Sequence, residues 1–250
     1  MVKLIIVRHG NSIGNFKRIF IGQTDWGLSE IGEEQVKRLT EYLKDFHIDE
    51  IYSSDLCRAY NTVLPTAERL GLEIHKREGL REIYAGEWEQ TTFTELAEKF
   101  PETYWTFQND IGNAHPDGGE SIKEVFYRIK NTIEQILAEN DGKTVLIGTH
   151  ATVIRVMNCL WHGDTLENLQ KYDWVTNAAV CHIEYEDGKY NVVEYGHDDH
   201  LEGIITHVGV KKNRIDQIKN VDFSLCILHK INERSIFLYI NYLQLKLVVI

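Results

Sequence analysis

Short apolar runs alternate with segments of helical periodicity along most of the chain, and this alternation restricts the fold more than any other feature. Residues 3–7, 48–53 and 144–148 are apolar runs of strand length. Residues 28–46 and 121–139 instead place apolar side chains at helical spacing. Strands that alternate with helices usually lie parallel in one sheet, with helices on both faces. The sequence therefore predicts an α/β fold, a three-layer sandwich with a mostly parallel central sheet.

The chain divides by composition into two parts. We take residues 1–207 as one domain, which ends in two strand-like runs, 179–185 and 190–195, joined by a hairpin turn at Glu186-Asp187-Gly188. Residues 208–250 carry seven Lys and Arg against three Asp and Glu, a net charge of +4, and end in an apolar run. We expect a basic, apolar C-terminal extension there, packed against protein and not a membrane anchor. The sequence does not indicate its role.

The composition argues against several classes of protein. The net charge of −11 disfavours general nucleic-acid binding, because affinity for the phosphate backbone needs clustered Lys and Arg. No apolar run reaches the ~20 residues that a membrane-spanning helix needs. The four cysteines are scattered with no CxxC pair, which suits a reducing compartment better than a disulfide framework or a zinc site. We expect a cytoplasmic protein, and the sequence leaves open whether it forms a homodimer.

Residues able to bind phosphate follow three of the expected strands. Arg8 and His9 come directly after the run at 3–7, Arg58 lies one turn beyond Ser53, and His150 follows Thr149 at the end of another run. Sites in open α/β sheets form at the carboxyl ends of the strands. We therefore expect these side chains to meet at one rim of the sheet.

Two arginines and two histidines at one rim are suited to phosphoryl transfer. Guanidinium groups match phosphate oxygens in shape and stay charged at any working pH. Neighbouring cations should lower the pKa of His9, so that its neutral ring can attack phosphorus. A second, protonated histidine, His150, would help the arginines to hold the phosphate oxygens. The segment 80–89 contains carboxylates that could give a proton to the leaving group.

Five short motifs occur here in the order found in one known family. They are Arg8-His9-Gly10-Asn11-Ser12 with Asn15, Ser54-Asp55-Leu56-Cys57-Arg58-Ala59, Leu80-Arg81-Glu82-Ile83, Gly118-Gly119-Glu120-Ser121 and Gly148-Thr149-His150. Together they resemble the histidine phosphatase superfamily, also called phosphoglycerate mutase-like, over roughly residues 1–201. One departure is Ala151, where the family usually has glycine.

This resemblance implies a phosphoglycerate mutase-like fold and a role for each motif. His9 would be the phosphorylated nucleophile and Glu82 the proton donor, with Glu87 and Glu89 as alternatives for the acid. The phosphate and substrate contacts would come from Arg8, Arg58, His150, Asn15 and Gly22. Such a mechanism needs no metal and no other cofactor. We interpret residues 197–200, which are of metal-ligand types, as a solvated terminus.

Within the family, the sequence favours a phosphatase. Cofactor-dependent phosphoglycerate mutases have Glu-Arg-His-Tyr-Gly where this chain has Glu82-Ile83-Tyr84-Ala85-Gly86, and this chain lacks an Arg-Arg pair at 100–120. The pattern is more similar to the broad-specificity or α-ribazole phosphatase branch. We predict hydrolysis of a small phosphorylated metabolite, a phosphate monoester. The alternatives are a phosphoglycerate mutase and a catalytically inactive module that binds a phosphorylated ligand.

Two further segments have structural interpretations. Gly118-Gly119-Glu120-Ser121 lacks the GxxxxGK[ST] pattern of a phosphate-binding loop, so we interpret it as the turn and cap that start a helix. The aromatic residues Tyr104, Trp105 and Phe107 should cover the core. A further hypothesis is that they also form a wall of the leaving-group pocket.

Overall fold

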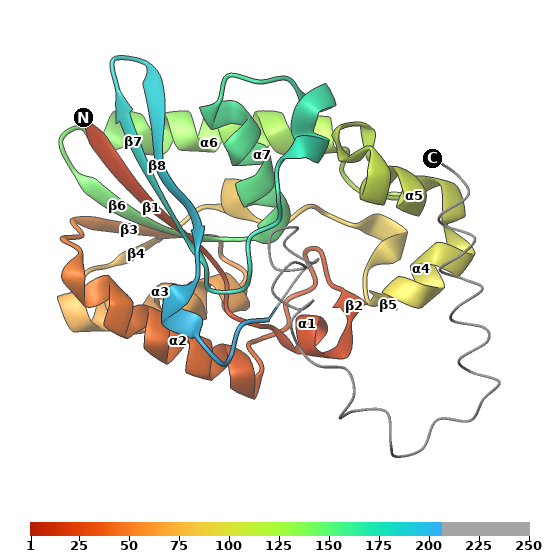
Figure 1. Cartoon of the computed structure of the whole chain (residues 1–250), viewed down its shortest axis with the longest axis horizontal. Coiled ribbons are helices and arrows are strands. Elements are labelled where there is room, and N and C mark those ends of the chain that lie inside the picture. The colour runs from red at the N-terminus through yellow and green to blue at the C-terminus, as the bar shows by residue number, and fades with distance from the viewer. Residues whose placement is uncertain (207–250) are drawn as a thin grey trace, which may run out of the picture. The chain divides into compact units, whose positions relative to one another are not determined.

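A six-stranded sheet lies at the centre of the computed structural model, which describes residues 1–206 (Figure 1). The strands, in the order β4-β3-β6-β1-β7-β8, are Ile74–Lys76, Glu50–Ser53, Thr144–Thr149, Val2–Arg8, Val180–Glu186 and Lys189–His197. The first four of these run parallel to one another. The strand β7 pairs antiparallel with β1, and β8 pairs antiparallel with β7. The mostly parallel sheet is thus confirmed, and the hairpin forms where it was expected. The proposed extension, residues 208–250, lies outside the described residues.

Helices cover both faces of this sheet. The helices α2 (Glu30–Tyr42) and α3 (Cys57–Leu70) lie on one face, and α6 (Ile122–Glu139) and α7 (Ala151–Trp161) lie on the other (Figure 1). Alternate side chains of β1 pack against the helices on opposite faces of the sheet, because successive residues of a strand point to opposite faces. Leu4 and Ile6 belong to the core with α6 and α7. Ile5 and Val7 belong to the core with α2 and α3. The three-layer sandwich is confirmed.

Serine caps begin two of these helices where the sequence predicts them. The Ser29 hydroxyl accepts a hydrogen bond from the Gly32 amide at 3.2 Å, one turn into α2. Ser121 and Glu124 form a reciprocal capping box at the start of α6. Each cap satisfies an amide that the first turn of a helix leaves unpaired. The interpretation of residues 118–121 as a turn and cap is confirmed.

Several short elements beside the carboxyl ends of the parallel strands have no counterpart in the sequence prediction. They are α1 (Ile13–Lys17), β2 (Ile19–Phe20), β5 (Thr91–Thr92), α4 (Phe93–Lys99) and α5 (Pro101–Asn109). Figure 1 shows them together at one end of the sheet. The strands β2 and β5 have two residues each, which is too few to show an alternating pattern. The three helices have nine residues or fewer, at most about two and a half helical turns, so their hydrophobic period is short.

The segment at 197–200 is packed against the fold, so the expectation of a solvated terminus is wrong. The rings of Tyr42, His197 and His200 cluster together, with the Tyr42 centroid 4.8 Å from each histidine and the two histidine centroids 5.7 Å apart. Asp198 is buried and accepts a hydrogen bond from the Thr176 hydroxyl at 2.9 Å. The cause is a short turn after β8 that folds the chain back onto α2.

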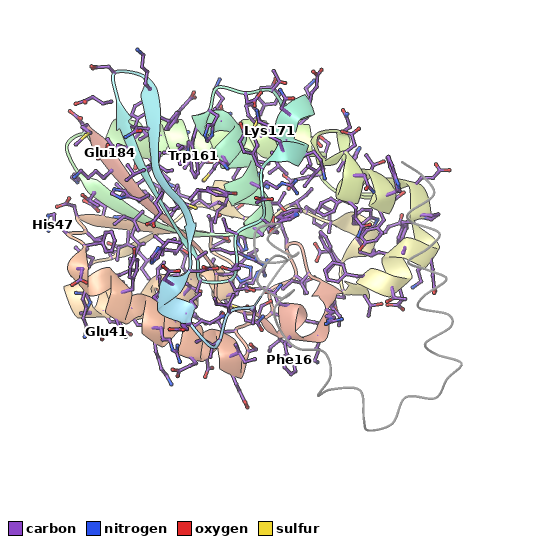
Figure 2. All side chains as sticks on the ribbon, in the orientation of Figure 1. Phe16, Glu41, His47, Trp161, Lys171 and Glu184 are labelled. Carbon is purple, nitrogen blue, oxygen red and sulfur yellow. The ribbon has the colours of Figure 1, made fainter. Side chains whose placement is uncertain are left out.

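Side chains fill the space between the sheet and both helical layers, while some apolar side chains remain on the surface. Phe16 is 66% exposed and projects from α1 at the edge of the molecule (Figure 2). Within residues 1–206, no helix has both the length and the apolar character that crossing a membrane would require.

Candidate active site

Strand register brings the three expected segments to one rim. In the sheet, β6 lies between β3 and β1. Arg8 at the end of β1 pairs with Thr149, and Ser53 at the end of β3 pairs with Gly148. The chain therefore leaves three neighbouring strands at the same level. The structure brings Arg8, His9, Arg58, Glu82 and His150 together there, as the sequence predicts.

His9 is held as a neutral ring with one defined tautomer. Its Nδ1 lies 2.7 Å from the Gly10 carbonyl oxygen, and because a carbonyl can only accept, Nδ1 carries the proton. Its Nε2 therefore carries the lone pair. Burial, then the charges of Arg58 and Arg8, hold the pKa of His9 well below 6.5. The predicted direction is confirmed, although burial contributes more than the cations on which the prediction rests.

Arg8 and Arg58 are buried cations held by main-chain carbonyls. Arg8 donates to the Val175 carbonyl at 2.7 Å, and Arg58 donates to Gly22 at 2.6 Å and Thr24 at 2.9 Å. Burial lowers the pKa of Arg8 to about 10, with the charge of Arg58 adding to this and Glu82 opposing it. Both guanidinium groups therefore remain charged at neutral pH, next to His9.

His150 lies against His9, with ring centroids 5.2 Å apart. Its Nε2 is 2.8 Å from the Ser54 hydroxyl. Burial, followed by the charge of Arg58, lowers its pKa well below 6.5. The expectation of a protonated second histidine is therefore wrong for the protein by itself. A neutral His150 can still donate one hydrogen bond to an anion.

Three buried donors of this group have no hydrogen-bond partner. Among residues 1–206, eight buried side-chain polar atoms have none, and three of them are Arg8 Nε, Arg58 Nε and His150 Nδ1. An unsatisfied buried donor costs about 1–3 kcal/mol, more when it is charged. Their concentration beside one histidine fits a site that binds an anion.

Glu82 completes the polar set. Its Oε1 accepts from the Ile83 amide at 2.9 Å, and its Oε2 accepts from the Thr152 amide at 3.3 Å, in the first turn of α7. Glu82 lines the same cavity as His9. The alternatives Glu87 and Glu89 do not line it, and Glu89 instead binds Thr24 and the main chain of residues 23, 24 and 85.

Asn15 and Gly22 line the cavity too, as the resemblance implies. The Asn15 side-chain oxygen accepts from Ser12 and from Asn177, which also donates to the His9 carbonyl. Gly22 has a φ of +32°, and an added Cβ would lie 2.1 Å from a Glu89 oxygen. Only glycine therefore fits at this position, where the carbonyl binds Arg58.

Large apolar side chains form an apolar wall of the cavity, which has a volume of about 560 Å³. They are Phe16, Ile19, Phe20, Ile21, Ile31, Phe93, Phe107 and Trp174. Arg18 is a third cation on this lining, beyond Arg8 and Arg58. Of the three aromatic residues proposed as a wall, Phe107 lines the cavity, but Tyr104 and Trp105 do not.

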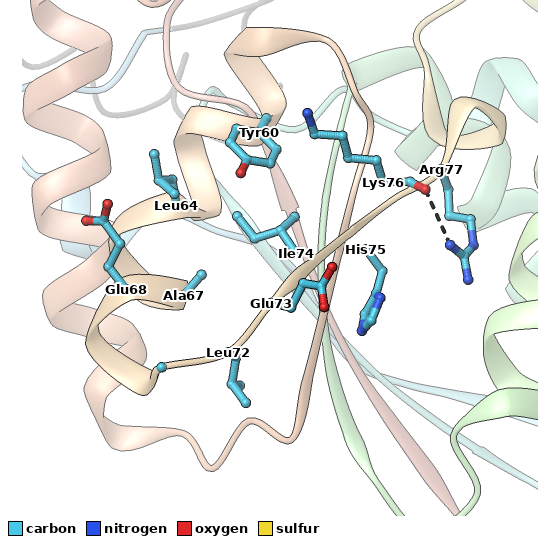
Figure 3. Close-up of a pocket in the computed structure, with 11 residues that line it drawn as sticks. Tyr60, Leu64, Ala67, Glu68, Leu72, Glu73, Ile74, His75, Lys76 and Arg77 are labelled. Carbon is cyan, nitrogen blue, oxygen red and sulfur yellow. Dashed lines mark hydrogen bonds between the residues drawn. The ribbon is translucent and has the colours of Figure 1, made fainter.

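A second hollow, of about 680 Å³, lies between α3 and the edge strand β4 (Figure 3). None of the predicted site residues lines it. Its lining charges are mixed, with Glu68 and Glu73 as well as Lys76 and Arg77, and the Lys76 amine lies 4.5 Å from the centre of the Tyr60 ring. It therefore lacks a converging set of cations, and we assign the candidate active site to the cavity at His9.

The sequence prediction missed several residues that hold the site. Ser54 lies in one of the five motifs but has no predicted role of its own, and no predicted role falls on Thr152, Val175 or Asn177. Two of these act through main-chain atoms, which every residue type carries, so sequence gives no signal for them. Asn177 lies just before β7, where a polar residue is common in any loop.

Comparison with known proteins agrees with this geometry. The model of the histidine phosphatase superfamily (branch 1) matches residues 4–198. Phosphoserine phosphatase 1 of Hydrogenobacter thermophilus is 33% identical over 201 residues, covering 80% of this chain and 95% of that protein. Among solved structures, YhfR of Bacillus stearothermophilus superposes with a TM-score of 0.78 at 28% identity, over 81% of this chain and all of that one. A mycobacterial glucosyl-3-phosphoglycerate phosphatase gives 0.74 at 25% identity, over 78% and 99%.

The chain belongs to the histidine phosphatase superfamily. The match spans all five motifs of the sequence, from Arg8 to His150. Relatives named as phosphatases, together with this family, support a phosphoric monoester hydrolase.

Proposed function

We propose that this protein hydrolyses small phosphate monoesters through a phosphohistidine on His9, with Glu82 as proton donor. The Nε2 lone pair of His9 attacks phosphorus, so that a P–N bond forms and the ester P–O bond breaks. Glu82 gives its proton to the leaving oxygen. Water then attacks the phosphohistidine with Glu82 as base, which releases inorganic phosphate and restores both residues. Arg8, Arg58 and His150 would hold the phosphate oxygens, with Asn15 and Gly22 beside the substrate.

One observation carries this proposal. A neutral imidazole with its lone pair on Nε2 lines one cavity together with Arg8, Arg58 and Glu82. His150 lies against this ring, and buried donors of Arg8, Arg58 and His150 have no partner. Electrostatic stabilisation by such prepared donors is usually the largest contribution to phosphoryl transfer. The names of the phosphoserine and glucosyl-3-phosphoglycerate phosphatases support substrates of the same size class.

The cavity lining favours a phosphatase over a mutase. A mutase must bind a second small acid and keep water from its phosphohistidine, which calls for further cations in the pocket. Beyond Arg8 and Arg58, Arg18 is the one Lys or Arg on the described lining, and eight large apolar side chains make up about half of the other lining residues. This composition suits an ester with an apolar leaving group better than a phosphoglycerate.

A single assay separates the three candidate functions. The purified protein is incubated with p-nitrophenyl phosphate, without added metal or bisphosphoglycerate, and separately with 3-phosphoglycerate. Steady hydrolysis that His9→Ala abolishes supports the phosphatase. Isomerisation of phosphoglycerate without hydrolysis would establish the mutase instead. Neither activity, together with binding of inorganic phosphate, would establish a binding module.

We also infer a cytoplasmic location for this protein. The cysteines at 57, 159 and 181 are free thiols, as in a reducing compartment. A homodimer remains a proposal, for which the mass of the protein in solution is the test.

A further inference from the structure

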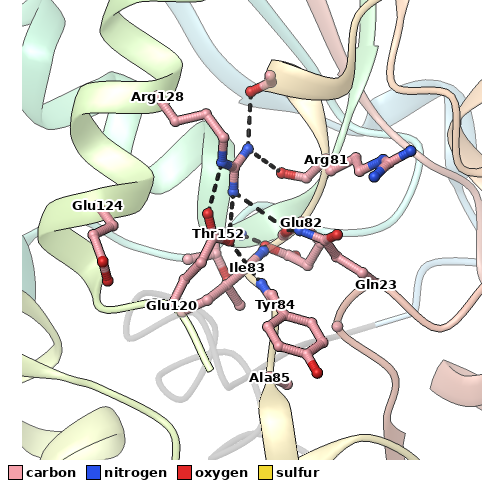
Figure 4. Close-up of polar contacts among 12 residues, drawn as sticks. Gln23, Arg81, Glu82, Ile83, Tyr84, Ala85, Glu120, Glu124, Arg128 and Thr152 are labelled. Carbon is pink, nitrogen blue, oxygen red and sulfur yellow. Dashed lines mark hydrogen bonds and ion pairs between the residues drawn. The ribbon is translucent and has the colours of Figure 1, made fainter. Parts of the chain in front are cut away.

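One arginine outside the cavity holds the loop that carries Glu82. Arg128, on α6, is not among the cavity-lining residues. Its guanidinium donates to the carbonyls of Gly79 and Arg81, both at 2.9 Å, and to that of Glu82 at 3.4 Å (Figure 4). A side chain of another element thus fixes the main chain up to and including the proposed proton donor.

Glu120 holds the same loop from the other side. Arg128 pairs with it through two bonds, Nε to Oε1 at 2.9 Å and Nη2 to Oε2 at 2.8 Å. The Glu120 carboxylate also accepts from the Tyr84 amide at 2.8 Å, and its own amide donates to the Tyr84 carbonyl at 2.8 Å. The main chain is therefore fixed both before and after Glu82, as Figure 4 shows.

The geometry of this pair is specific to arginine. A guanidinium has five N–H donors in a rigid fork, and here they meet five acceptors, three carbonyls and two carboxylate oxygens. Lysine would bring the same charge with three donors on a flexible stem, so it cannot reproduce the arrangement. Both side chains of the pair are only 22% exposed, unlike an ordinary surface ion pair.

The position of the Glu82 carboxylate depends directly on this main chain. Its Oε1 is bound by the adjacent Ile83 amide, and its Oε2 by the Thr152 amide at the longer distance of 3.3 Å. A movement of the loop would therefore carry the carboxylate away from α7 and from the leaving oxygen. Misplacement of a reacting group by about 1 Å can reduce a rate by about a hundredfold.

We propose that Arg128 and Glu120 are positioning residues for proton transfer by Glu82. This inference rests on the proposed function, because it assigns the pair to the acid of that reaction. It extends that function to two residues that touch neither the phosphate-binding set nor the cavity. Gly118-Gly119-Glu120-Ser121 then has a second purpose beyond capping α6, since the same turn presents Glu120 to the loop.

The test compares two esters that differ in their need for an acid. An alkyl phosphate leaves as a strongly basic alkoxide and needs a proton, whereas p-nitrophenolate leaves without one. The ratio of kcat/KM for the alkyl ester to that for p-nitrophenyl phosphate reports acid catalysis, because kcat/KM covers only the steps up to loss of the leaving group. We expect Glu82→Gln to lower this ratio by about a hundredfold or more. Arg128→Lys and Glu120→Gln should each lower it by about tenfold.

The double variant shows whether Arg128 acts through Glu82. In the Glu82→Gln background, Arg128→Lys should leave the ratio unchanged, because the acid is already absent. Arg77→Lys is the matched control. Arg77 pairs with Glu139 at a distance of 3.0 Å and does not line the cavity, so this variant should have the same ratio as the unmodified protein. Thermal unfolding identifies any variant that is not folded, and Glu120→Gln tests the pair independently of Arg128→Lys.

Three results would overturn the inference. Equal losses for both esters in Arg128→Lys and Glu120→Gln would show a general structural role. An equal drop of the ratio with and without Glu82 would show that the pair acts by another route. Each of these two results, with the unmodified protein active, rejects the positioning role alone. If the unmodified protein hydrolyses neither ester, the proposed function fails and this inference fails with it.

Discussion

The Nδ1 atom of His9 lies 2.7 Å from the carbonyl oxygen of Gly10, and this contact decides which ring nitrogen can react. Because Nδ1 must carry the proton, Nε2 is the free nucleophile. A tautomer fixed by the adjacent residue needs no separate base to activate it. Burial keeps the same ring unprotonated by holding its pKa well below 6.5.

Replacing His9 with alanine should therefore abolish hydrolysis. We expect the release of p-nitrophenol to fall by about three orders of magnitude or more, because His9 is the one histidine among the described lining residues and carries the proposed covalent intermediate. In the unmodified protein, a phosphoprotein that is labile in acid and stable in base should be trapped on rapid quenching. His47→Ala is the control, since His47 is 82% exposed and pairs only with Asp49. A variant without His9 that still forms the phosphoprotein would place the nucleophile elsewhere.

The two buried histidines should make the fold less stable in mild acid. Burial lowers the pKa of both His9 and His150, and that of His200 in the same direction. As the pH falls through about 6.5, the unfolded chain takes up protons that the folded protein does not, so stability falls. We expect the free energy of unfolding to decrease by about 1 kcal/mol for His9 and for His150 between about pH 6.5 and 5.5. Above about pH 7.5 these rings should contribute no pH dependence.

Urea unfolding at several pH values in phosphate-free buffer measures this effect. His150→Gln should remove about 1 kcal/mol of the decrease, since it removes one of the buried rings. An identical pH dependence in the variant and the unmodified protein would mean that folding does not lower the pKa of His150. Inorganic phosphate, which we expect to bind only the folded protein, should raise stability at every pH tested.

The sheet and the cationic part of the site could be predicted because both appear as patterns of consecutive residues in the sequence. A run of four apolar residues marks β1 and a run of three marks β6, and the reactive residues lie at the ends of these strands, with Arg8 as the last residue of β1 and His150 directly after β6. The rim then follows from the parallel order of the strands. The strand β2, of two residues, is too short to show any pattern.

The acceptors that hold the arginines could not be predicted from the sequence. Arg8 and Arg58 are held by carbonyls of Val175, Gly22 and Thr24, and a carbonyl is present at every residue. Which of them reaches a guanidinium depends on loop conformation and not on residue type. The prediction of a protonated His150 is wrong for a related reason. Complete burial lowers the pKa of this ring, and sequence shows neighbouring groups more readily than burial.

The apolar wall should favour esters with aromatic leaving groups, and Phe93 tests this. Phe93 lines the cavity and remains partly exposed, so its ring is available to a bound leaving group. We expect Phe93→Ala to lower kcat/KM for 1-naphthyl phosphate by roughly fivefold, about 1 kcal/mol of lost apolar contact, and to leave a short alkyl phosphate nearly unchanged.

Trp105→Ala is the control for this prediction. Trp105 is 60% exposed and does not line the cavity, so both esters should react as in the unmodified protein. Equal changes for the two esters in Phe93→Ala would contradict a role of this wall in selectivity. A change in the relative rates of the two esters in Trp105→Ala would support the hypothesis that Tyr104, Trp105 and Phe107 form the wall.

Ser54 should control how well His150 binds an anion. Its hydroxyl oxygen accepts from the Leu56 amide at 3.3 Å, which directs the hydroxyl proton to Nε2 of His150 at 2.8 Å. The ring then carries its own proton on the buried, unpartnered Nδ1, ready to donate. In Ser54→Ala the tautomer of His150 is no longer fixed, and we expect the inhibition constant of orthovanadate to rise about threefold to tenfold, the usual contribution of one neutral hydrogen bond.

Ser53→Ala is the matched control, because the Ser53 hydroxyl donates to the Ser54 carbonyl at 2.8 Å and has no bond to His150. Its inhibition constant should stay within about twofold, and an equal rise in both variants would show that Ser54 acts only through the local packing of the loop.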